Sequence, residues 1–379
     1  MSTLSNEDYQ AFEDMFVQFA TSELKPNHEV YNQLPFYDFP LPLFQQALEL
    51  GMFDVLVSEE ANGLGLSLHH TCQLIGRLSE YNAGLATAIL CHSLSVEIIS
   101  LAQQQDLLIK HHQTSYSKRL PIIAYPAFSN PIHSESSITA TPSDMGYSLT
   151  GICDFLSLGE HARFAVIPAM IRSPDDNSHD TSFSYFFVEL EQTSVQCIET
   201  IFSLGLNLCP AIDVALQGAK ATLIGKPGAG KHLFSTMRDK LSIVGAAIAQ
   251  GIMQGCLREA LDYAQQRTQG GKLLHQWSEI SVILAEMNMA VSHTEMAIKA
   301  ASQLTDQLAD DWQQYNLAVS TTTQKQACDV TTNGIQVLGG YGYMKDYGQE
   351  QRFRDASQLQ CLLGQYRLKS FDCLHKVMQ

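Results

Sequence analysis

A glycine-rich and charged stretch near the C-terminal end contains the residue types best suited to chemistry. It reads Gln336-Val-Leu-Gly-Gly-Tyr-Gly-Tyr-Met-Lys-Asp-Tyr-Gly-Gln-Glu-Gln-Arg-Phe-Arg-Asp-Ala356. We interpret it as a helix that ends at the paired glycines, a compact aromatic turn, and a second helix with internal acid–base pairing. Gly339 and Gly340 leave bare backbone where another group can come close. That group could be a phosphate or a neighbouring helix, and these residues do not decide between the two.

A second glycine-rich segment, Gly225-Lys-Pro-Gly-Ala-Gly-Lys231, is similar to a phosphate-binding loop. The next residue is His232 instead of the serine or threonine that would bind Mg²⁺. The surrounding sequence also lacks the alternating strands and helices of a nucleotide-hydrolysing fold. We therefore interpret this segment as a Pro-Gly turn that enters a helix. No set of serine, histidine and aspartate, or of cysteine and histidine, has a spacing that predicts nucleophilic catalysis or a metal site.

The composition excludes several classes of protein. The 379 residues carry 23 Lys and Arg against 39 Asp and Glu, a formal net charge of −16, which argues against a nucleic-acid partner. Apolar residues make up 45% and charged residues 16%, which predicts a folded protein with extensive surface buried between subunits. The nine dispersed cysteines predict reduced thiols. The polar, acidic start and the lack of an apolar run near ~20 residues predict a cytoplasmic protein without a signal peptide or membrane insertion.

Three successive segments supply the elements that must position these residues. Residues 1–118 have helical periodicity, residues 119–227 contain short β-type runs separated by turns, and residues 228–379 are helical again. We therefore expect an α+β fold with three domains at these boundaries. The closely spaced strands predict an antiparallel sheet or a small barrel, and a strand-like run starts at Phe53. The expected C-terminal helices cover 232–267, 275–308, 311–338 and 351–376. Small residues along the first of these helices predict close helix packing.

The stretch from Gln336 to Ala356 resembles the acyl-CoA dehydrogenase family, which carries Q-x-x-GG-x-G-(Y/F)-x-x-(D/E)-Y-P-x-E-x-x-x-RDA at this place. The matching residues are Gln336, Gly339, Gly340, Gly342, Tyr343, Asp346, Tyr347, Glu350, Arg354, Asp355 and Ala356. Gly348 replaces the family's proline. Two further segments match: residues 267–272, Arg-Thr-Gln-Gly-Gly-Lys, are similar to R-x-x-FGK, and residues 49–67 are similar to the family's elGlfgl.vpeeyGGlGls pattern. The resemblance extends over essentially the whole chain.

The resemblance implies a helical N-terminal domain, a middle β-barrel domain and a C-terminal four-helix bundle, in a dimer or tetramer that contains FAD. It also implies α,β-dehydrogenation of an acyl group carried on coenzyme A or on a carrier protein, as in fatty acid metabolism. In that reaction a base removes a proton from carbon α, and a hydride leaves carbon β for the flavin. Because the α proton is weakly acidic, the reaction needs a carboxylate within reach and hydrogen-bond donors to the thioester oxygen.

Neither family position for that base carries an acid in this chain. Counting on from Arg354-Asp355-Ala356 places Leu363 where most members have glutamate. Other members place the base 26 residues before the arginine of R-x-x-FG, and that position is Leu241 here. Neither leucine can accept a proton. Asp239 and Asp372 are the nearest acids in the sequence, but neither has the spacing to take over, so the sequence names no catalytic residue.

The expected flavin contacts fall into two groups, because the family shares each FAD across a subunit interface. In the donated group, the neighbour's arginine and Q-x-x-GG motif hold the pyrophosphate and adenosine. Arg267, Gln336, Gly339 and Gly340 supply this group and are intact. An ordinary salt-bridge role for Arg267 stays open.

The second group, around the flavin ring, has drifted. The T-E-P-x-A-G-S-D loop has become Tyr125-Pro-Ala-Phe-Ser-Asn-Pro-Ile132. The following W-(I/V)-T-N-G segment survives as Phe155-Leu-Ser-Leu-Gly159, in which Ser157 still offers a hydroxyl near flavin N5. The Phe155 ring could cover the flavin or belong to the core, and Gln365 completes the expected cofactor contacts. We expect FAD to bind weakly or to be shared with a partner subunit.

Three functions stay open from the sequence. The first is a dehydrogenase on acyl-CoA or acyl-carrier protein that uses an unrecognised base. The second is a non-catalytic subunit that supports the FAD site of an active homologous partner, because the motif losses are uneven. The third is flavin monooxygenase-type chemistry on the same fold, which needs no α-proton base. We expect the chain to self-associate or to pair with a homologous acyl-CoA dehydrogenase subunit.

Overall fold

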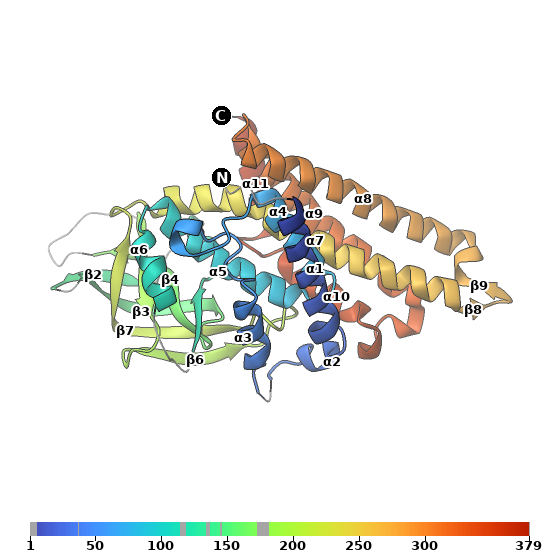
Figure 1. The fold of residues 1–379 in the computed structure, drawn as a ribbon, viewed down its shortest axis with the longest axis horizontal. Coiled ribbons are helices and arrows are strands. Elements are labelled where there is room, and N and C mark those ends of the chain that lie inside the picture. The colour runs from blue at the N-terminus through green and yellow to red at the C-terminus, as the bar shows by residue number, and fades with distance from the viewer. Residues whose placement is uncertain are drawn as a thin grey trace.

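The computed structural model describes residues 6–36, 38–113, 119–133, 137–144, 146–172 and 182–378. A group of helices, a β-sheet and a long helical bundle follow one another along the chain (Figure 1). This order confirms the α+β class expected from the sequence. The domain boundaries remain predictions, because position 118 lies outside the described residues and position 227 lies in a turn before the first bundle helix.

The N-terminal part consists of α1 (Asn6–Phe19), the π-helix η1 (Ala20–Leu24), α2 (His28–Tyr31), α3 (Leu41–Glu49), the 3₁₀ turn η2 (Glu59–Ala61), α4 (Leu68–Ser79), α5 (Ala83–Leu101) and α6 (Gln105–Gln113). Ser67 and Asn82 cap α4 and α5, because their side-chain oxygens accept N–H bonds from the first turn of each helix. The expectation of a strand starting at Phe53 is wrong, because this segment consists of turns. The carbonyls of Val55 and Val57 accept N–H bonds from a nearby loop instead of a partner strand.

Two helices are long and apolar enough to cross a membrane when only length and composition are considered. They are α5 and α7 (Gly230–Gln266), and polar and charged residues interrupt the apolar runs of both helices. However, 89% of the apolar window in α5 and 83% of that in α7 are buried inside the protein. Both helices therefore have the burial of core helices, with apolar residues on all sides.

The middle part is built from β1 (Leu120–Ala124), β2 (Thr139–Ser143), β3 (Gly146–Ser157), β4 (Ala162–Ile171), β5 (Phe183–Glu189), β6 (Val195–Ile201) and β7 (Ala211–Ile224). Successive pairings of β4, β2, β3, β7 and β5 return to β4 and so close a ring. This confirms the expected barrel. Most pairings are antiparallel, but β4 pairs in parallel with β1 and with β2, so the sheet is mixed.

The C-terminal part is a bundle of α7, α8 (Ser278–Asp306) and α9 (Trp312–Leu338), followed by the shorter helices α10 (Gln349–Leu359) and α11 (Tyr366–Val377). A small hairpin of β8 (Thr268–Gln269) and β9 (Lys272–Leu273) joins α7 to α8. The glycines of α7 allow close packing, as expected. A Cβ atom added at Gly251 would lie only 2.2 Å from the Gly76 carbonyl oxygen of α4.

The single helix expected over 351–376 is instead two helices separated by a turn at 360–365. Leu363 has a φ of 57° and Gly364 a φ of 121°, and a right-handed helix cannot contain either value. The break is important for the candidate site, because Leu363 lies in this turn.

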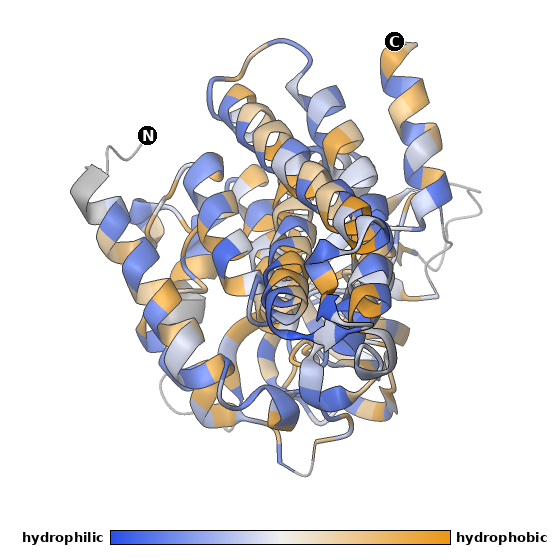
Figure 2. Cartoon of the chain, turned by 90° about the vertical axis from the view of Figure 1, so that its right-hand side faces the viewer, coloured by the Kyte–Doolittle hydropathy of each residue, from blue (hydrophilic) through white to orange (hydrophobic). Residues whose placement is uncertain are grey.

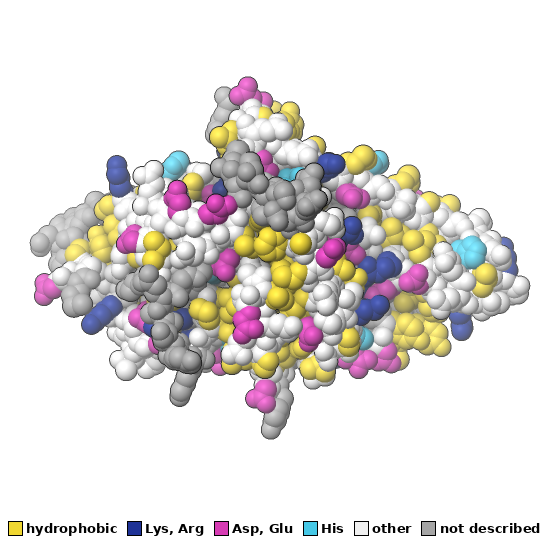
Figure 3. Space-filling view, in the orientation of Figure 1, with side chains coloured by type: hydrophobic (Ala, Val, Ile, Leu, Met, Phe, Trp, Pro, Cys, Tyr) yellow, Lys and Arg dark blue, Asp and Glu magenta, His cyan; other side chains and the backbone are white. Residues whose placement is uncertain are grey.

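Apolar side chains remain exposed on the outer helices. On α8, Val282, Met289 and Met296 are spaced by seven residues and are all more than half exposed. Figure 2 shows α11 standing apart from the rest of the bundle, and its residues Phe371 and Leu374 are exposed in the same way. Apolar side chains also reach the surface along the bundle in Figure 3. Exposed apolar faces of this kind are typical of surfaces that associate with another protein, and burial between subunits remains a prediction.

Candidate functional site

The turn between α10 and α11 places Leu363 against the β domain. Its backbone N–H donates to the carbonyl oxygen of Ala127 at 2.7 Å, and its side chain is buried. Leu241 of α7 is fully buried as well. Next to Leu363, Leu362 fills the space beside Gly245 of α7, where an added Cβ would lie 2.7 Å from a Leu362 methyl group. Hydrocarbon side chains therefore occupy both positions at which the family resemblance places a base.

The two acids nearest in sequence are both engaged in ion pairs. Asp239 pairs with Arg238 at 3.1 Å and with Lys376 at 2.7 Å. Asp372 pairs with the same Arg238 at 2.7 Å and lies 3.6 Å from His133. Since each carboxylate is fixed by cations, neither is available to a substrate, in agreement with the spacing argument.

Ser157 and Phe155 lie at the end of β3, where the strand is irregular. The Ser157 N–H donates to the Tyr125 carbonyl oxygen at 3.2 Å. Its hydroxyl oxygen is buried beside the Cys209 thiol and has no hydrogen-bond partner of good geometry among the described residues. Phe155 has a φ of 54°, and 43% of its surface is exposed. Its N–H donates to the Asp213 carboxylate at 2.9 Å.

This arrangement bears on the flavin ring. A buried hydroxyl without a good hydrogen-bond partner costs free energy, so Ser157 has a donor to offer a flavin, but a flavin would have to reach it where no surface is exposed in this structure. Because the Phe155 ring is exposed, Phe155 is not a core residue. Its exposure suits a side chain that covers a bound ligand. Gln365 is exposed at the start of α11, next to the turn that carries Leu363.

Arg267 and the paired glycines come together at the other end of the bundle. Arg267 follows α7, and its guanidinium carbon lies 5.8 Å from the centre of the Tyr341 ring. Tyr341 directly follows Gly339 and Gly340 in the sequence. Gly339 has a φ of 57°, and an added Cβ would meet no atom within 4 Å, so its backbone faces open space. Gln336, one turn earlier, is exposed. An exposed guanidinium beside bare backbone fits an anionic group such as a pyrophosphate.

Figure 1 shows how far apart these two groups lie within one chain. The β8–β9 hairpin, which directly follows Arg267, is at the end of the bundle that points away from the β domain. Ser157 belongs to that β domain.

Asp355 connects the bundle to the segment that precedes β7. Its carboxylate accepts the N–H of Leu206 at 2.6 Å, and the side chain of Gln358 accepts the N–H of Gly205 at 2.7 Å. Arg354 donates to Glu350 at 2.7 Å and to the Leu204 carbonyl oxygen at 2.9 Å. The Arg-Asp-Ala motif therefore has a structural task in this chain. Burial raises the pKa of Asp355 to about 6.

The raised pKa of Asp355 predicts a specific pH dependence of stability. The folded protein holds this proton up to about pH 6, whereas an unfolded aspartate releases it near 3.8, so stability from this group is present at low pH and lost as the pH rises through 6. Asp355→Asn keeps an acceptor for Leu206 but cannot titrate. Urea unfolding of both proteins from pH 4 to pH 7 should show the wild type losing about 3 kcal/mol relative to the variant. Parallel stability curves would contradict this.

Two family models match the helical parts of the chain. The model described as "Acyl-CoA dehydrogenase, N-terminal domain" matches residues 6–108, and "Acyl-CoA dehydrogenase, C-terminal domain" matches residues 236–366, together more than half of the chain. The chain belongs to the acyl-CoA dehydrogenase family. It is similar to the benzylmalonyl-CoA dehydrogenase of Aromatoleum aromaticum, with 25% identity over 92% of each chain.

Solved structures show the same fold. Butyryl-CoA dehydrogenase from Megasphaera elsdenii superposes with a TM-score of 0.86 at 21% identity over all of both chains. The prolyl acyl carrier protein oxidase AnaB gives a TM-score of 0.82 at 18% identity over 99% of this chain and all of that one. The acyl-CoA dehydrogenase architecture of helical domain, β domain and helical bundle, expected from the resemblance, is thus confirmed.

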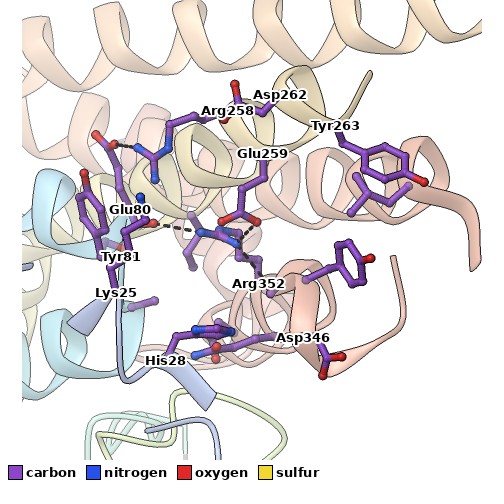
Figure 4. A pocket seen from close by; sticks show the side chains of 18 of the residues that line it. Lys25, His28, Glu80, Tyr81, Arg258, Glu259, Asp262, Tyr263, Asp346 and Arg352 are labelled. Carbon is purple, nitrogen blue, oxygen red and sulfur yellow. Dashed lines mark hydrogen bonds and ion pairs between the residues drawn. The ribbon is translucent and has the colours of Figure 1, made fainter. Parts of the chain in front are cut away.

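One cavity of this acyl-CoA dehydrogenase family member was not foreseen from the sequence. It has a volume of about 480 Å³ and lies between the N-terminal helices, the end of α7 and the start of α10 (Figure 4). Arg258 pairs with Glu80 at 2.6 Å, and Arg352 pairs with Glu259 at the same distance. None of the expected cofactor residues lines it. Asp346, Arg352 and Asp355 of its lining belong to the motif stretch from Gln336 to Ala356, but the other charged residues come from distant parts of the sequence, so the motif did not reveal the cavity.

Proposed function

We propose that this chain is a FAD-dependent oxidoreductase that carries out α,β-dehydrogenation of an acyl thioester on coenzyme A or on a carrier protein. The observation that carries the proposal is the family match of both helical domains, and the exposed Arg267 guanidinium near the open backbone of Gly339 supports it. When bound, FAD supplies the hydride acceptor. The relatives' dehydrogenase names do not favour monooxygenase-type chemistry, so we do not propose it.

The two groups of residues have different tasks in this proposal. Arg267, Gln336, Gly339 and Gly340 hold the pyrophosphate and adenosine of the neighbouring chain's FAD. In the chain's own site, Ser157 donates to the flavin ring, while Phe155 and Gln365 border it. The separation of the groups within one chain supports sharing of FAD across a self-association interface. The exposed apolar faces of α8 and α11 support such an interface.

Leu363 stands in this proposal at the family's base position, and Leu241 at the alternative one. This observation favours a second candidate, a non-catalytic subunit that completes the FAD site of a homologous, active partner. The bond from the Leu363 N–H to Ala127 strengthens that candidate, because it occupies a donor of the turn where an acyl group would have to enter. We further propose that the protein acts in the cytoplasm.

The absorbance spectrum of the purified protein and a panel of acyl-CoA substrates with a dye acceptor test both candidates. Flavin bands near one per chain together with dye reduction would support the dehydrogenase. Bound flavin with complete inactivity, or a colourless protein that co-purifies with an active homologue, would support the non-catalytic subunit. A homo-oligomer that is active by itself would remove the second candidate.

A further inference from the structure

Lys369 is a buried lysine whose ammonium group is surrounded by oxygens. It belongs to α11, and only 4% of its surface is exposed. Its Nζ donates to the carbonyl oxygens of Gln360 at 2.8 Å and Leu362 at 3.0 Å, and to the side-chain oxygen of Gln324 at 2.7 Å. These acceptors match the three protons of an ammonium group, and the two carbonyls alone match the two protons of a neutral amine. A buried lysine that is fully paired in this way is a costly feature that requires an explanation.

The oxygens that Lys369 binds belong mostly to the turn that carries Leu363. Two of them are the backbone carbonyls three residues and one residue before Leu363, where α10 has just ended. Carbonyls at the end of a helix have no partner inside it, and N–H donors from Lys369 satisfy two of them here. Leu363 itself adopts a left-handed conformation that costs free energy in a residue with a side chain. The contacts of Lys369 therefore restrain a turn that would otherwise relax.

A continuous series of hydrogen bonds leads from this turn to the flavin side of the site. The Leu363 N–H donates to the Ala127 carbonyl, and the N–H of Ala127 donates to the Tyr125 carbonyl at 2.8 Å. The same Tyr125 oxygen accepts the N–H of Ser157. A change at Lys369 can therefore reach Ser157 through backbone atoms of the turn and of residues 125–127.

We propose that Lys369 is a positioning residue that fastens the Leu363 turn onto residues 125–127 and thereby sets the geometry of the acyl and flavin site. The effect on an acyl and flavin site rests on the proposed function. The hydrogen bonds of Lys369 to the turn do not depend on that function. It acts through backbone carbonyls and touches neither substrate nor cofactor.

The charge of Lys369 gives the fastening a pH dependence. The groups that face it are Arg238 of α7, Cys361 of the turn and Cys373 of its own helix. Burial lowers the pKa of Lys369 from 10.5 to about 7. When the turn opens, the lysine returns to water and to its ordinary pKa. The closed turn then holds fewer protons than the open one between these values, so rising pH favours closure by up to about tenfold per pH unit.

Hydrogen exchange at the Leu363 amide tests this inference, because that N–H is freed only when the turn leaves Ala127. Exchange would be followed by mass spectrometry with electron-transfer fragmentation from pH 6 to pH 9, corrected for the intrinsic rate. In the wild type, we expect corrected exchange to slow as the pH rises above about 7. In Lys369→Met the pH slope should vanish, and at pH 9 exchange should be at least about tenfold faster, because two buried carbonyls lose their donor.

Lys376→Met is the matched control, since it removes a cation from the same helix that pairs with Asp239 and does not bind the turn. It should keep the wild-type slope. Gln324→Leu, which removes one acceptor and leaves the lysine, should speed exchange less and in the same direction. It provides a second variant in case Lys369→Met does not fold. Equal pH slopes in the wild type and Lys369→Met, or no acceleration in either variant, would overturn the proposal.

This readout needs no flavin, so it is separate from the proposed function. A colourless, inactive wild type that still shows the lysine-dependent slope would reject the proposed function and support the positioning role. If flavin is bound, the shape of its absorbance bands should differ between the wild type and Lys369→Met but not between the wild type and Lys376→Met. Flavin bands and exchange that are identical in all three proteins would reject the positioning role and leave the proposed function intact.

Discussion

Leu363→Glu is expected to raise the rate of flavin reduction by an acyl-CoA at least about 100-fold, because a positioned general base contributes on the order of 10² to 10⁴ to such a step. The substitution puts a carboxylate in the turn beside residues 125–127, at the position where most family members have their base. The measurement is the loss of the oxidised flavin band after rapid mixing with substrate. The rate should increase with pH, since burial raises the pKa of the introduced acid and only its ionised form accepts a proton.

Leu363→Gln is the control for this substitution. It has the shape and polarity of glutamate but cannot take the proton, so its rate should stay at the wild-type level. Both variants must contain bound flavin for the comparison to count. A flavin-loaded glutamate variant with no gain over the glutamine variant would show that the acyl pocket has diverged beyond the loss of the base, and would favour the non-catalytic subunit.

Arg267→Gln is expected to weaken FAD binding by about 10- to 100-fold, since a charge-assisted bond to a phosphate contributes about 1.5 to 3 kcal/mol. The guanidinium is exposed beside Tyr341 and the bare backbone of Gly339, so it has no buried ion pair to lose, and the fold should stay stable. The dissociation constant can be measured by titrating apoprotein with FAD and following the quenching of flavin fluorescence. FMN, which lacks the adenylate half, should bind equally to both proteins.

Lys272→Gln supplies the matched control, because Lys272 lies on the hairpin that directly follows Arg267 but donates to the Gln276 carbonyl and packs on the Trp277 ring. It should leave FAD affinity unchanged. If both substitutions weaken binding equally, the effect is one of general charge. If neither does, Arg267 has only a structural role and the assignment of the donated group is wrong.

The long helices and the order of the three parts could be predicted from the sequence because they depend on local patterns. The small residues of α7, such as Gly251, predict close helix packing. The turn residues between short apolar runs predict a β domain. The strand expected at Phe53 failed for a physical reason. A strand needs a partner, and Val55 and Val57 find theirs in a tight loop a few residues later.

The candidate site was foreseen only where a short motif carries it. Arg267 and Gly339 were recognised from their spacing, and the structure brings their neighbourhood together through the Tyr341 ring. The break at Leu363 was missed, because its left-handed backbone depends on contacts of Lys369 and Ala127 that no local pattern encodes. Asp355 was recognised as part of a motif, but its bond to Leu206 joins segments about 150 residues apart and could not be read from the sequence.

The distance between the Arg267 end of the bundle and the β domain has a consequence for how the protein is made. If FAD is shared between chains as proposed, a newly synthesised chain contributes part of two different FAD sites and contains no complete FAD site. Cofactor loading then has to wait for assembly, and strong dilution should release the flavin as the subunits part. The fraction of protein that contains flavin would thus depend on subunit concentration. A cell that makes one chain type in excess of its counterpart would accumulate that chain without bound flavin.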